Sequence, residues 1–468
     1  NVNIVCYNRS MVEELLKSIE NRNEVDLSEK TKKELKENLE KHFKFVKKGK
    51  EAFLGNFNPW QKTEGKEIIR KFIGNVGNPD STANFSWLEI LDKDKQWKEL
   101  PDEEAKMEIK NKSIHVNMHY QIPTHFHGDI DNAVIFHCME NPRGYLGDYK
   151  DSYIDKGLEN IDLGDYFGKT YTLLNKDNSS RKTVENIEKI LNQYSKDDLP
   201  DVKEIIKERY QLDKDEFNDE LIANIIYSDQ SNLSRELKKI FNEEDEFFEK
   251  EYNLKKNKNS KNPVLSEKYY YLAQYYAQLL KINGKNLSEF KPELGKEYTP
   301  KQNNALQRAE KICNLEIYPF SCADPDLGNN GIGKKILLNS NLSRLGAYIV
   351  LRRIYKYLKD CENSVKDNRN EPEKPGFVFR KYDGAWKILF KELFEEVGVA
   401  DKFLECLEDH FFYCQPASAG GGITSGNVIS VRNFRILQDV YAKVKEIAFN
   451  EIDNLLPRIS IDKDETNY

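Results

Sequence analysis

Two short loops carry the side chains of this chain that are best suited to chemistry. One reads M-E-N-P-R at residues 139–143, and the other reads Q-P-A-S-A-G-G-G at residues 415–422. A carboxylate or an amide in such a loop, such as Glu140 or Asn141, can stabilise a developing positive charge or orient a water molecule. Glycines in the second loop allow backbone N–H groups to approach a phosphate closely. Each loop alone is a common kind of turn, so the elements that position them decide whether they form one site.

A cluster of histidines indicates a second kind of chemistry. Five of the seven histidines lie in one segment, at His115, His119, His125, His127 and His137. The run H-F-H-G-D at residues 125–129 places two imidazoles and a carboxylate within reach of one ion, which favours a metal-dependent hydrolase as an alternative. Alternating histidines share a face only in a strand, and His137 lies in an apolar run where a buried, hydrogen-bonded imidazole is common. We therefore expect no metal ligand and no other cofactor.

The elements around the two loops follow a strand–helix rhythm. Four apolar runs predict buried strands, at residues 131–139, 311–320, 376–382 and 410–417. Helical spacing of apolar residues follows the last three runs, at residues 343–359, 385–397 and 431–448. Parallel strands need connections of a dozen or more residues and are buried on both faces. The pattern therefore predicts an α/β fold whose central parallel four-stranded sheet is flanked by helices.

Ligands of such sheets bind at the carboxyl ends of the strands, where the loops converge. The loop at 139–143 follows the first predicted strand, and Pro142 and Gly144 force a sharp exit from it. The loop at 415–422 follows the last predicted strand. We therefore expect both loops at one edge of the sheet.

Large helical regions surround this core. Residues 1–105 and 151–301 show apolar residues three or four apart, interrupted by the polar run L-K-K-N-K-N-S-K-N-P at residues 254–263. We interpret the first region as an N-terminal helical region and the second as a helical insertion. Residues 106–150 and 302–468 then form the α/β core.

The two loops, in this order and each after a strand, resemble those of the uracil-DNA glycosylase superfamily. That family has a loop of the form G-x-(D/N)-P-(Y/G) after its first strand and H-P-S followed by small residues after its last. The run I-P-T-H-F-H-G-D-I-D-N-A-V at residues 122–134 resembles the segment upstream of the first loop. The resemblance covers residues 122–145 and 311–448. It implies an α/β enzyme that acts on bases in DNA, without a cofactor.

The resemblance also implies roles for single residues. Asn141 would position a water for attack on the deoxyribose C1′, and Gln415 would donate to the departing base. The base pocket would include Arg143, Tyr145, Tyr318 and Phe320, with an aromatic ring stacking on an extruded base. The phosphate and DNA contacts would come from Ser418, Gly420, Gly421 and Gly422.

This sequence departs from the family's pattern at several of these positions. The transition state of glycoside cleavage resembles an oxocarbenium ion, and Asn141 carries no charge to stabilise it. Gln415 is a weaker donor than the family's histidine, so we expect slow catalysis that depends on the neighbouring Glu140. Arg143 stands where a Tyr or Gly shapes the pocket for uracil, which argues against ordinary uracil excision. A catalytically inactive sensor of nucleic acid or protein, with residues 151–301 as its partner surface, is therefore the alternative.

Composition limits which class of protein this chain can be and in which compartment we expect it. Charged residues make up 32% of the 468 residues, the formal net charge is −7, and no apolar run approaches the ~20 residues that cross a bilayer. Seven scattered cysteines without a C-x-x-C pair exclude a zinc ribbon and, with no visible signal peptide, predict a cytoplasmic protein. The acidic balance does not itself indicate a DNA partner, although a local basic groove can coexist with it. The abundance of Lys and Asn is typical of low-GC bacteria or mobile elements and suits defence against phage DNA with modified bases.

Overall fold

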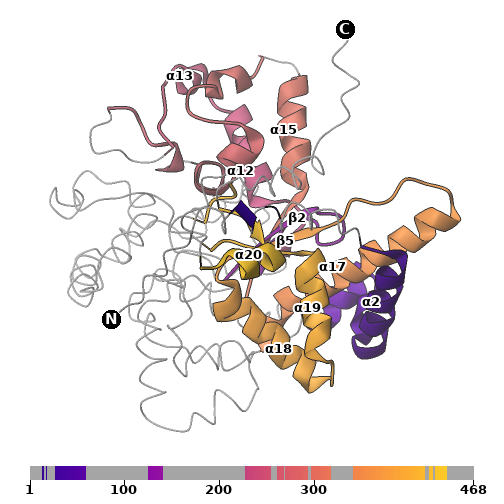
Figure 1. The fold of residues 1–468 in the computed structure, drawn as a ribbon. Coiled ribbons are helices and arrows are strands. Elements are labelled where there is room, and N and C mark those ends of the chain that lie inside the picture. Colours follow the sequence, from indigo (N-terminus) through magenta and orange to yellow (C-terminus); the bar gives the residue numbers. More distant parts are fainter. Residues whose placement is uncertain are drawn as a thin grey trace, which may run out of the picture.

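A computed structural model describes eleven segments of the chain, which Figure 1 shows as a coloured ribbon. The described residues are 13–14, 17, 27–58, 125–140, 227–254, 261–267, 269–293, 297–317, 341–416, 421–424 and 427–439. They form a sheet with a layer of helices on each face, so the predicted α/β class is confirmed (Figure 1).

The sheet has seven strands in the order β3-β1-β4-β2-β5-β6-β7. Their bounds are β1 Phe126–His127, β2 Ile135–Met139, β3 Tyr227–Ser228, β4 Ile312–Glu316, β5 Gly376–Phe379, β6 Phe412–Cys414 and β7 Ile429–Ser430. Strand β2 pairs in parallel with β4 and with β5, and β5 pairs in parallel with β6. The pairs β1–β4 and β6–β7 are antiparallel, whereas β1 and β3 are parallel.

The sheet is therefore larger than the predicted four-stranded parallel sheet, and it is mixed. The additional strands β1, β3 and β7 are each two residues long. Strands this short leave no periodic pattern in a sequence, because two residues cannot show an alternation of polar and apolar side chains. Their pairing depends on tertiary contacts alone.

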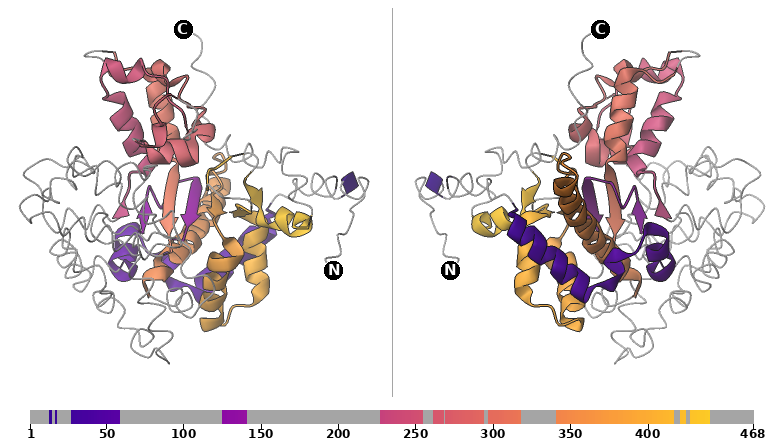
Figure 2. Two further views of the ribbon diagram at one scale, coloured as in Figure 1. Left: turned by 90° about the vertical axis from the view of Figure 1, so that its left-hand side faces the viewer. Right: turned by 90° about the vertical axis from the view of Figure 1, so that its right-hand side faces the viewer.

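One face of the sheet packs on the largest apolar cluster of the described residues. The helices on this side are α17 (Asn341–Lys366), α18 (Lys387–Glu396), α19 (Asp401–His410) and α20 (Val431–Leu437). The N-terminal helices α2 (Glu29–His42) and α3 (Lys50–Phe57), joined by η1 (Lys44–Lys47), lie on this side too, with α2 against α17 (Figure 2). Every residue of β2 is buried, so both faces of this strand are covered.

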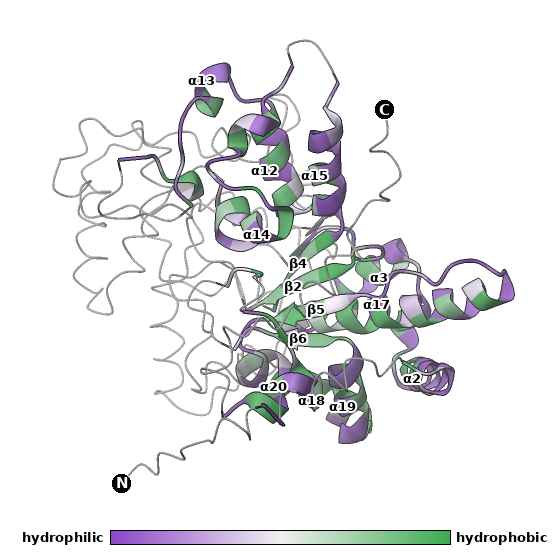
Figure 3. Cartoon of the chain, turned by 45° about the horizontal axis from the view of Figure 1, so that its top comes forward, coloured by the Kyte–Doolittle hydropathy of each residue, from purple (hydrophilic) through white to green (hydrophobic). Residues whose placement is uncertain are grey.

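The other face packs on a second helical layer, which includes a π-helix. This layer consists of α12 (Asn232–Phe241), α13 (Asp245–Phe248), η6 (Leu265–Glu267), the π-helix η7 (Leu272–Tyr276), α14 (Ala277–Leu280), η8 (Leu287–Phe290) and α15 (Pro300–Glu310). Figure 3 shows apolar surfaces of α12 and α14 turned toward the strands, with polar residues along α15. The tyrosine-rich run at residues 269–276 contributes core residues of this layer.

Local sequence signals explain where two of these helices begin. Thr299 caps α15 in a capping box with Gln302, and Pro300 occupies the first turn, where no N–H is needed. Ser231 accepts a hydrogen bond from the backbone N–H of Ser234 at the start of α12 and donates one to the carbonyl of Ala309. The Ser231 hydroxyl thus joins α12 to α15. No helix within the described ranges is both long and apolar enough to cross a membrane.

Candidate functional site

Polar residues gather where the parallel strands β4, β2, β5 and β6 end. Glu316 is the last residue of β4, Glu140 follows β2, Arg380 follows β5 and Gln415 follows β6. Backbone hydrogen bonds from Arg380 N–H to Cys138 O (2.9 Å) and from Gln415 N–H to Phe379 O (3.1 Å) extend the sheet to these residues. Because parallel strands end at the same edge, these residues lie along one edge of the sheet. We call this line of strand ends the carboxyl edge.

The strand order changes direction between β2 and β5. Along the chain, β2 is followed by β3 and β4 on one side of it, whereas β5 is followed by β6 on the other side. In open α/β sheets, ligands bind outside the carboxyl ends of the strands at such a switch point. The residues at this point are Glu140 and Lys381, and Glu140 Oε2 lies 3.5 Å from Lys381 Nζ.

Side-chain alternation directs polar residues of these strands toward the second helical layer. The face that packs on this layer includes Ile135, Ile312 and Val378. His137 is opposite Asn314 of β4 and Val378 of β5, so His137 and Asn314 also face the layer. The next row on the same face begins with Glu316 opposite Met139 and continues through Arg380 and Gln415. The other face of β2 carries only apolar side chains in the larger core.

A buried chain of hydrogen bonds connects the strands with the π-helix. The amide nitrogen of Asn314 donates to the hydroxyl oxygen of Tyr276, which lies 3.1 Å from His137 Nδ1. His137 Nε2 lies 3.3 Å from Gln415 Oε1, and Gln415 Nε2 donates to the carbonyls of Gly421 (3.0 Å) and Gly422 (3.1 Å). The side chains of Asn314, His137 and Gln415 are at most 4% exposed. These bonds therefore form in a dry environment, where each donor and acceptor needs a partner.

The direction of each hydrogen bond follows from the Gln415 amide, which stands at one end of this chain of hydrogen bonds. Both N–H groups of the Gln415 amide donate to carbonyls, so its Oε1 accepts the hydrogen bond that the N–H at His137 Nε2 donates. Burial, with the charge of Arg380 as a smaller cause, lowers the pKa of His137 to about 3. The imidazole is therefore neutral at physiological pH, and its Nδ1 accepts from the Tyr276 hydroxyl. Gln415 thus orients His137 and the glycine loop.

The carboxyl groups of Glu316 and Glu140 and the guanidinium of Arg380 lie near these hydrogen bonds. Burial raises the pKa of Glu316 well above its usual range, although Arg380 lowers it and Glu140 raises it by smaller amounts. Glu316 is 4% exposed, and within the described segments its Oε2 has no hydrogen-bond partner. Burial thus favours the protonated form of Glu316, which lies near Glu140 and Arg380. A buried carboxyl group with a strongly raised pKa is typical of acid–base sites.

The backbone near the carboxyl edge has unusual conformations in two segments. Lys381 adopts a left-handed conformation with φ of 45°, and the π-helix η9 (Tyr382–Trp386) follows it directly. On the opposite face, the π-helix η7 presents the Tyr275 and Tyr276 rings to His137, with centroid distances of 5.2 and 5.8 Å. Left-handed non-glycine residues and π-helices concentrate at functional sites. Both features favour the carboxyl edge as the functional site.

The described glycines of the second loop contact the protein itself. Gly421 has φ of +67°, and an added Cβ would lie 3.1 Å from both Tyr275 Cε1 and Arg380 Cζ. An added Cβ at Gly422 would lie 2.9 Å from the carbonyl oxygen of Gln274. Glycine is needed here because the loop touches η7 and Arg380 closely. A phosphate contact by these two glycines stays a prediction.

Only part of the predicted site falls within the described residues. The structure brings Glu140, Gln415, Gly421 and Gly422 to the carboxyl edge. The other predicted site residues lie outside the described ranges: Asn141, Arg143, Tyr145, Tyr318, Phe320, Ser418 and Gly420. Asn141 is nevertheless the next residue in the chain after Glu140.

Comparisons with protein-family models, with curated proteins and with solved structures found no match for this chain. The functional assignment therefore rests on the chemistry of the carboxyl edge.

The described histidines do not assemble a metal site. No group of three or more His, Cys, Asp or Glu side chains within the described ranges could hold an ion. His127 lies 2.6 Å from the guanidinium of Arg235, and burial lowers the pKa of His127 well below its usual value. His125 is fully buried, and His137 belongs to the hydrogen-bonded chain. His115 and His119 lie outside the described residues.

Several residues of the site have no marker in the sequence. Arg380 lies inside the third predicted strand, residues 376–382, whereas β5 ends at Phe379, so no sequence signal placed Arg380 at a strand end. Glu316 and Asn314 lie within the second predicted strand, which we expected to end at Phe320. Strand β4 ends at Glu316 instead, so the sequence did not place Glu316 at a strand end. Tyr276 belongs to a separate helix, and only the tertiary structure brings it to His137.

Proposed function

We propose that the carboxyl edge recognises a base of DNA and hydrolyses its N-glycosidic bond, as the resemblance to uracil-DNA glycosylases implies. One observation carries the proposal. The loops after β2 and β6, which carry that resemblance, both start at the edge of the sheet where Glu140, Glu316 and Arg380 lie near one another. DNA and its bases are therefore the proposed ligands.

The charged groups at the carboxyl edge suit hydrolysis of an N-glycosidic bond. As the bond between C1′ and the base nitrogen breaks, positive charge develops on the sugar and negative charge on the base. In our proposal, Glu140 stabilises the sugar cation, and Asn141 orients the water that adds to C1′. The water supplies OH to the sugar, and Glu316, kept protonated by its burial, donates a proton to the base. That water's second proton then restores Glu316.

Arg380 adds a guanidinium that can donate hydrogen bonds to a phosphate oxygen or to a base oxygen. Its guanidinium is half-buried, and it makes no ion pair with any described residue. It lies against Gly421, at the start of the second loop. A guanidinium with open donor positions binds phosphate with good geometry. Arg380 thus joins Arg143 as a proposed contact to the substrate.

Oligonucleotides with defined bases test the enzymatic proposal. The protein is incubated with DNA containing uracil, hypoxanthine or modified pyrimidines, including bases found in phage DNA, and abasic product is measured. We expect Glu140→Gln and Asn141→Ala to lower the rate by about 100-fold or more, because each removes stabilisation of the transition state. Glu37→Gln, on the exposed surface of α2, is the matched control. If folded protein releases no base from any of these substrates, the enzymatic proposal is wrong.

A catalytically inactive sensor of the same fold is the second candidate. It is favoured by the Gln415 amide, whose two protons already bind the Gly421 and Gly422 carbonyls. Gln415 would have to release one of them to donate to a base. DNA binding that does not depend on the base and is unchanged by Asn141→Ala would support the sensor. Failure to bind any DNA at low salt would contradict both candidates.

A further inference from the structure

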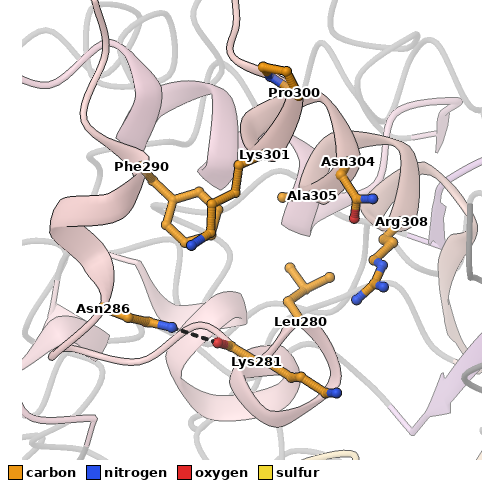
Figure 4. A pocket seen from close by; sticks show the side chains of 9 residues that line it. All are labelled: Leu280, Lys281, Asn286, Phe290, Pro300, Lys301, Asn304, Ala305 and Arg308. Atoms are coloured by element: carbon orange, nitrogen blue, oxygen red, sulfur yellow. Dashed lines mark hydrogen bonds between the residues drawn. The ribbon is translucent and has the colours of Figure 1, made fainter. Parts of the chain in front are cut away.

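A hollow of about 510 Å³ lies within the second helical layer, outside the carboxyl edge (Figure 4). One wall is α15, which contributes Lys301, Asn304 and Arg308. The opposite wall is formed by the end of α14, with Leu280 and Lys281, and by η8. The volume falls in the range of small-molecule sites.

All of the charged side chains that line this hollow are cationic. Its lining residues are Leu280, Lys281, Asn286, Phe290, Pro300, Lys301, Asn304, Ala305 and Arg308. Three of them are cationic and none is acidic. Lys301 already has partners within the protein, because it forms an ion pair with Glu289 and its ammonium lies 5.0 Å from the centroid of the Phe290 ring.

The two other cations have no partner among the described residues. Arg308 Nε is buried without a hydrogen bond, although a buried guanidinium N–H normally has an acceptor. Neither the Lys281 ammonium nor the Asn304 amide bonds to a described side chain or carbonyl. Figure 4 shows Asn304 and Arg308 one turn apart on α15, with Lys281 on the facing wall. These three side chains offer donors from two sides of one hollow.

We propose that this hollow binds the phosphate group of a small phosphorylated ligand through Arg308, Lys281 and Asn304. A phosphate carries up to two negative charges and so matches two cations, whereas a carboxylate carries only one. The guanidinium of Arg308 presents paired donors that suit a phosphate. The backbone helps to place Lys281, which caps α14 in a left-handed conformation with φ of 55°. The amide of Asn286 donates to its carbonyl at 2.8 Å.

Calorimetric titration of the full chain with pyrophosphate and with adenosine monophosphate tests this site. We expect a Kd tighter than about 1 mM. Lys281→Asn removes one charge with a residue that tolerates a positive φ, and Arg308→Gln removes the other. Each variant should weaken binding by about tenfold or more. Lys285→Gln and Arg369→Gln, which remove cations outside the hollow, should leave the Kd within about twofold of the unchanged protein.

Thermal unfolding of each variant establishes that it is folded. Lys281 is exposed, so Lys281→Asn provides a second variant whose effect on binding does not depend on a buried side chain. Absence of binding by either phosphate compound would overturn the proposal. Binding that survives in both variants, or citrate binding as tightly as pyrophosphate, would overturn it as well. Single-stranded DNA is the last competitor. If single-stranded DNA displaces pyrophosphate and Arg308→Gln weakens DNA binding to the same extent, the hollow binds the phosphate groups of nucleic acid. The small-ligand proposal is then wrong.

Discussion

Glu316 illustrates at the level of one residue how burial prepares a group for chemistry. A carboxyl group at the end of a buried strand loses its hydration, which disfavours the charged form. The unfolded chain releases the Glu316 proton near pH 4.5, whereas burial holds that proton to a higher pH in the folded chain. The folded protein then binds more protons than the unfolded chain, so Glu316 lowers the free energy of unfolding as pH rises above 4.5.

Replacing Glu316 with Gln should therefore stabilise the protein above this pH. We expect equal stability of the two proteins at about pH 4 and higher stability of Glu316→Gln at about pH 8, measured by urea unfolding. Glu405→Gln, at an exposed position of α19, is the control for replacing a carboxylate by an amide. Lower stability of Glu316→Gln at the higher pH would mean that Glu316 is ionised and paired with Arg380. If Glu316 donates a proton to the base, the same variant should also bind DNA normally but release base slowly.

The contact between the second loop and the π-helix η7 is an interaction between elements. Gly421 lies where the loop touches both Tyr275 and Arg380, and the N–H of Ile423 donates to the carbonyl of Tyr275 at 2.9 Å. This contact connects the helical layer to the strand ends. The orientation of Gln415, which donates to the Gly421 carbonyl, depends on it.

Gly421→Ala should disturb this contact more than its backbone angle alone predicts. The positive φ costs about 1 kcal/mol for any residue other than glycine, and forcing Tyr275 and Arg380 apart adds roughly 1–3 kcal/mol. Gly398 is the matched control, because it also has a positive φ of +70° but no atom within 4 Å of an added Cβ. Urea unfolding should show a larger loss of stability for Gly421→Ala than for Gly398→Ala. Equal losses would mean that the packing of the loop on η7 contributes nothing.

At the scale of the whole molecule, the neutral imidazole of His137 couples folding to pH. The unfolded chain protonates this histidine near pH 6.5, whereas the folded chain resists protonation down to about pH 3. The unfolded chain therefore binds more protons between these two pH values. As a result, His137 makes the free energy of unfolding fall as the medium becomes more acidic.

This coupling can be measured by comparing the protein with His137→Gln. Between pH 6.5 and about 4, the stability of the unchanged protein relative to the variant should fall by about 1.4 kcal/mol per pH unit. His42→Gln on α2 is the control for replacing an imidazole by an amide. Subtraction of the variant removes the contribution of other groups, including His410, whose pKa burial lowers to about 4. A constant difference for His137→Gln would contradict a buried neutral imidazole.

Local patterns predicted much of the fold because each signal lies within a few residues. The four apolar runs correspond to β2, β4, β5 and β6, since a strand buried on both faces must be apolar along its length. The helices after β5 and β6 likewise follow from apolar spacing, and the start of α15 follows from the Thr299 cap. The two-residue strands left no such pattern. They made the sheet mixed and larger than predicted.

The sequence by itself determined the α/β class, the strand-forming runs and the two loop starts at Glu140 and Gln415. Only the tertiary structure decided which side chains meet there. His137, Tyr276, Asn314 and Gln415 come from four separate segments, and strand order and register bring them into one hydrogen-bonded chain. The neutral state of Glu316 likewise depends on burial by distant elements. Periodicity reports the local environment of an element, whereas a site between strands depends on contacts between residues far apart in the chain.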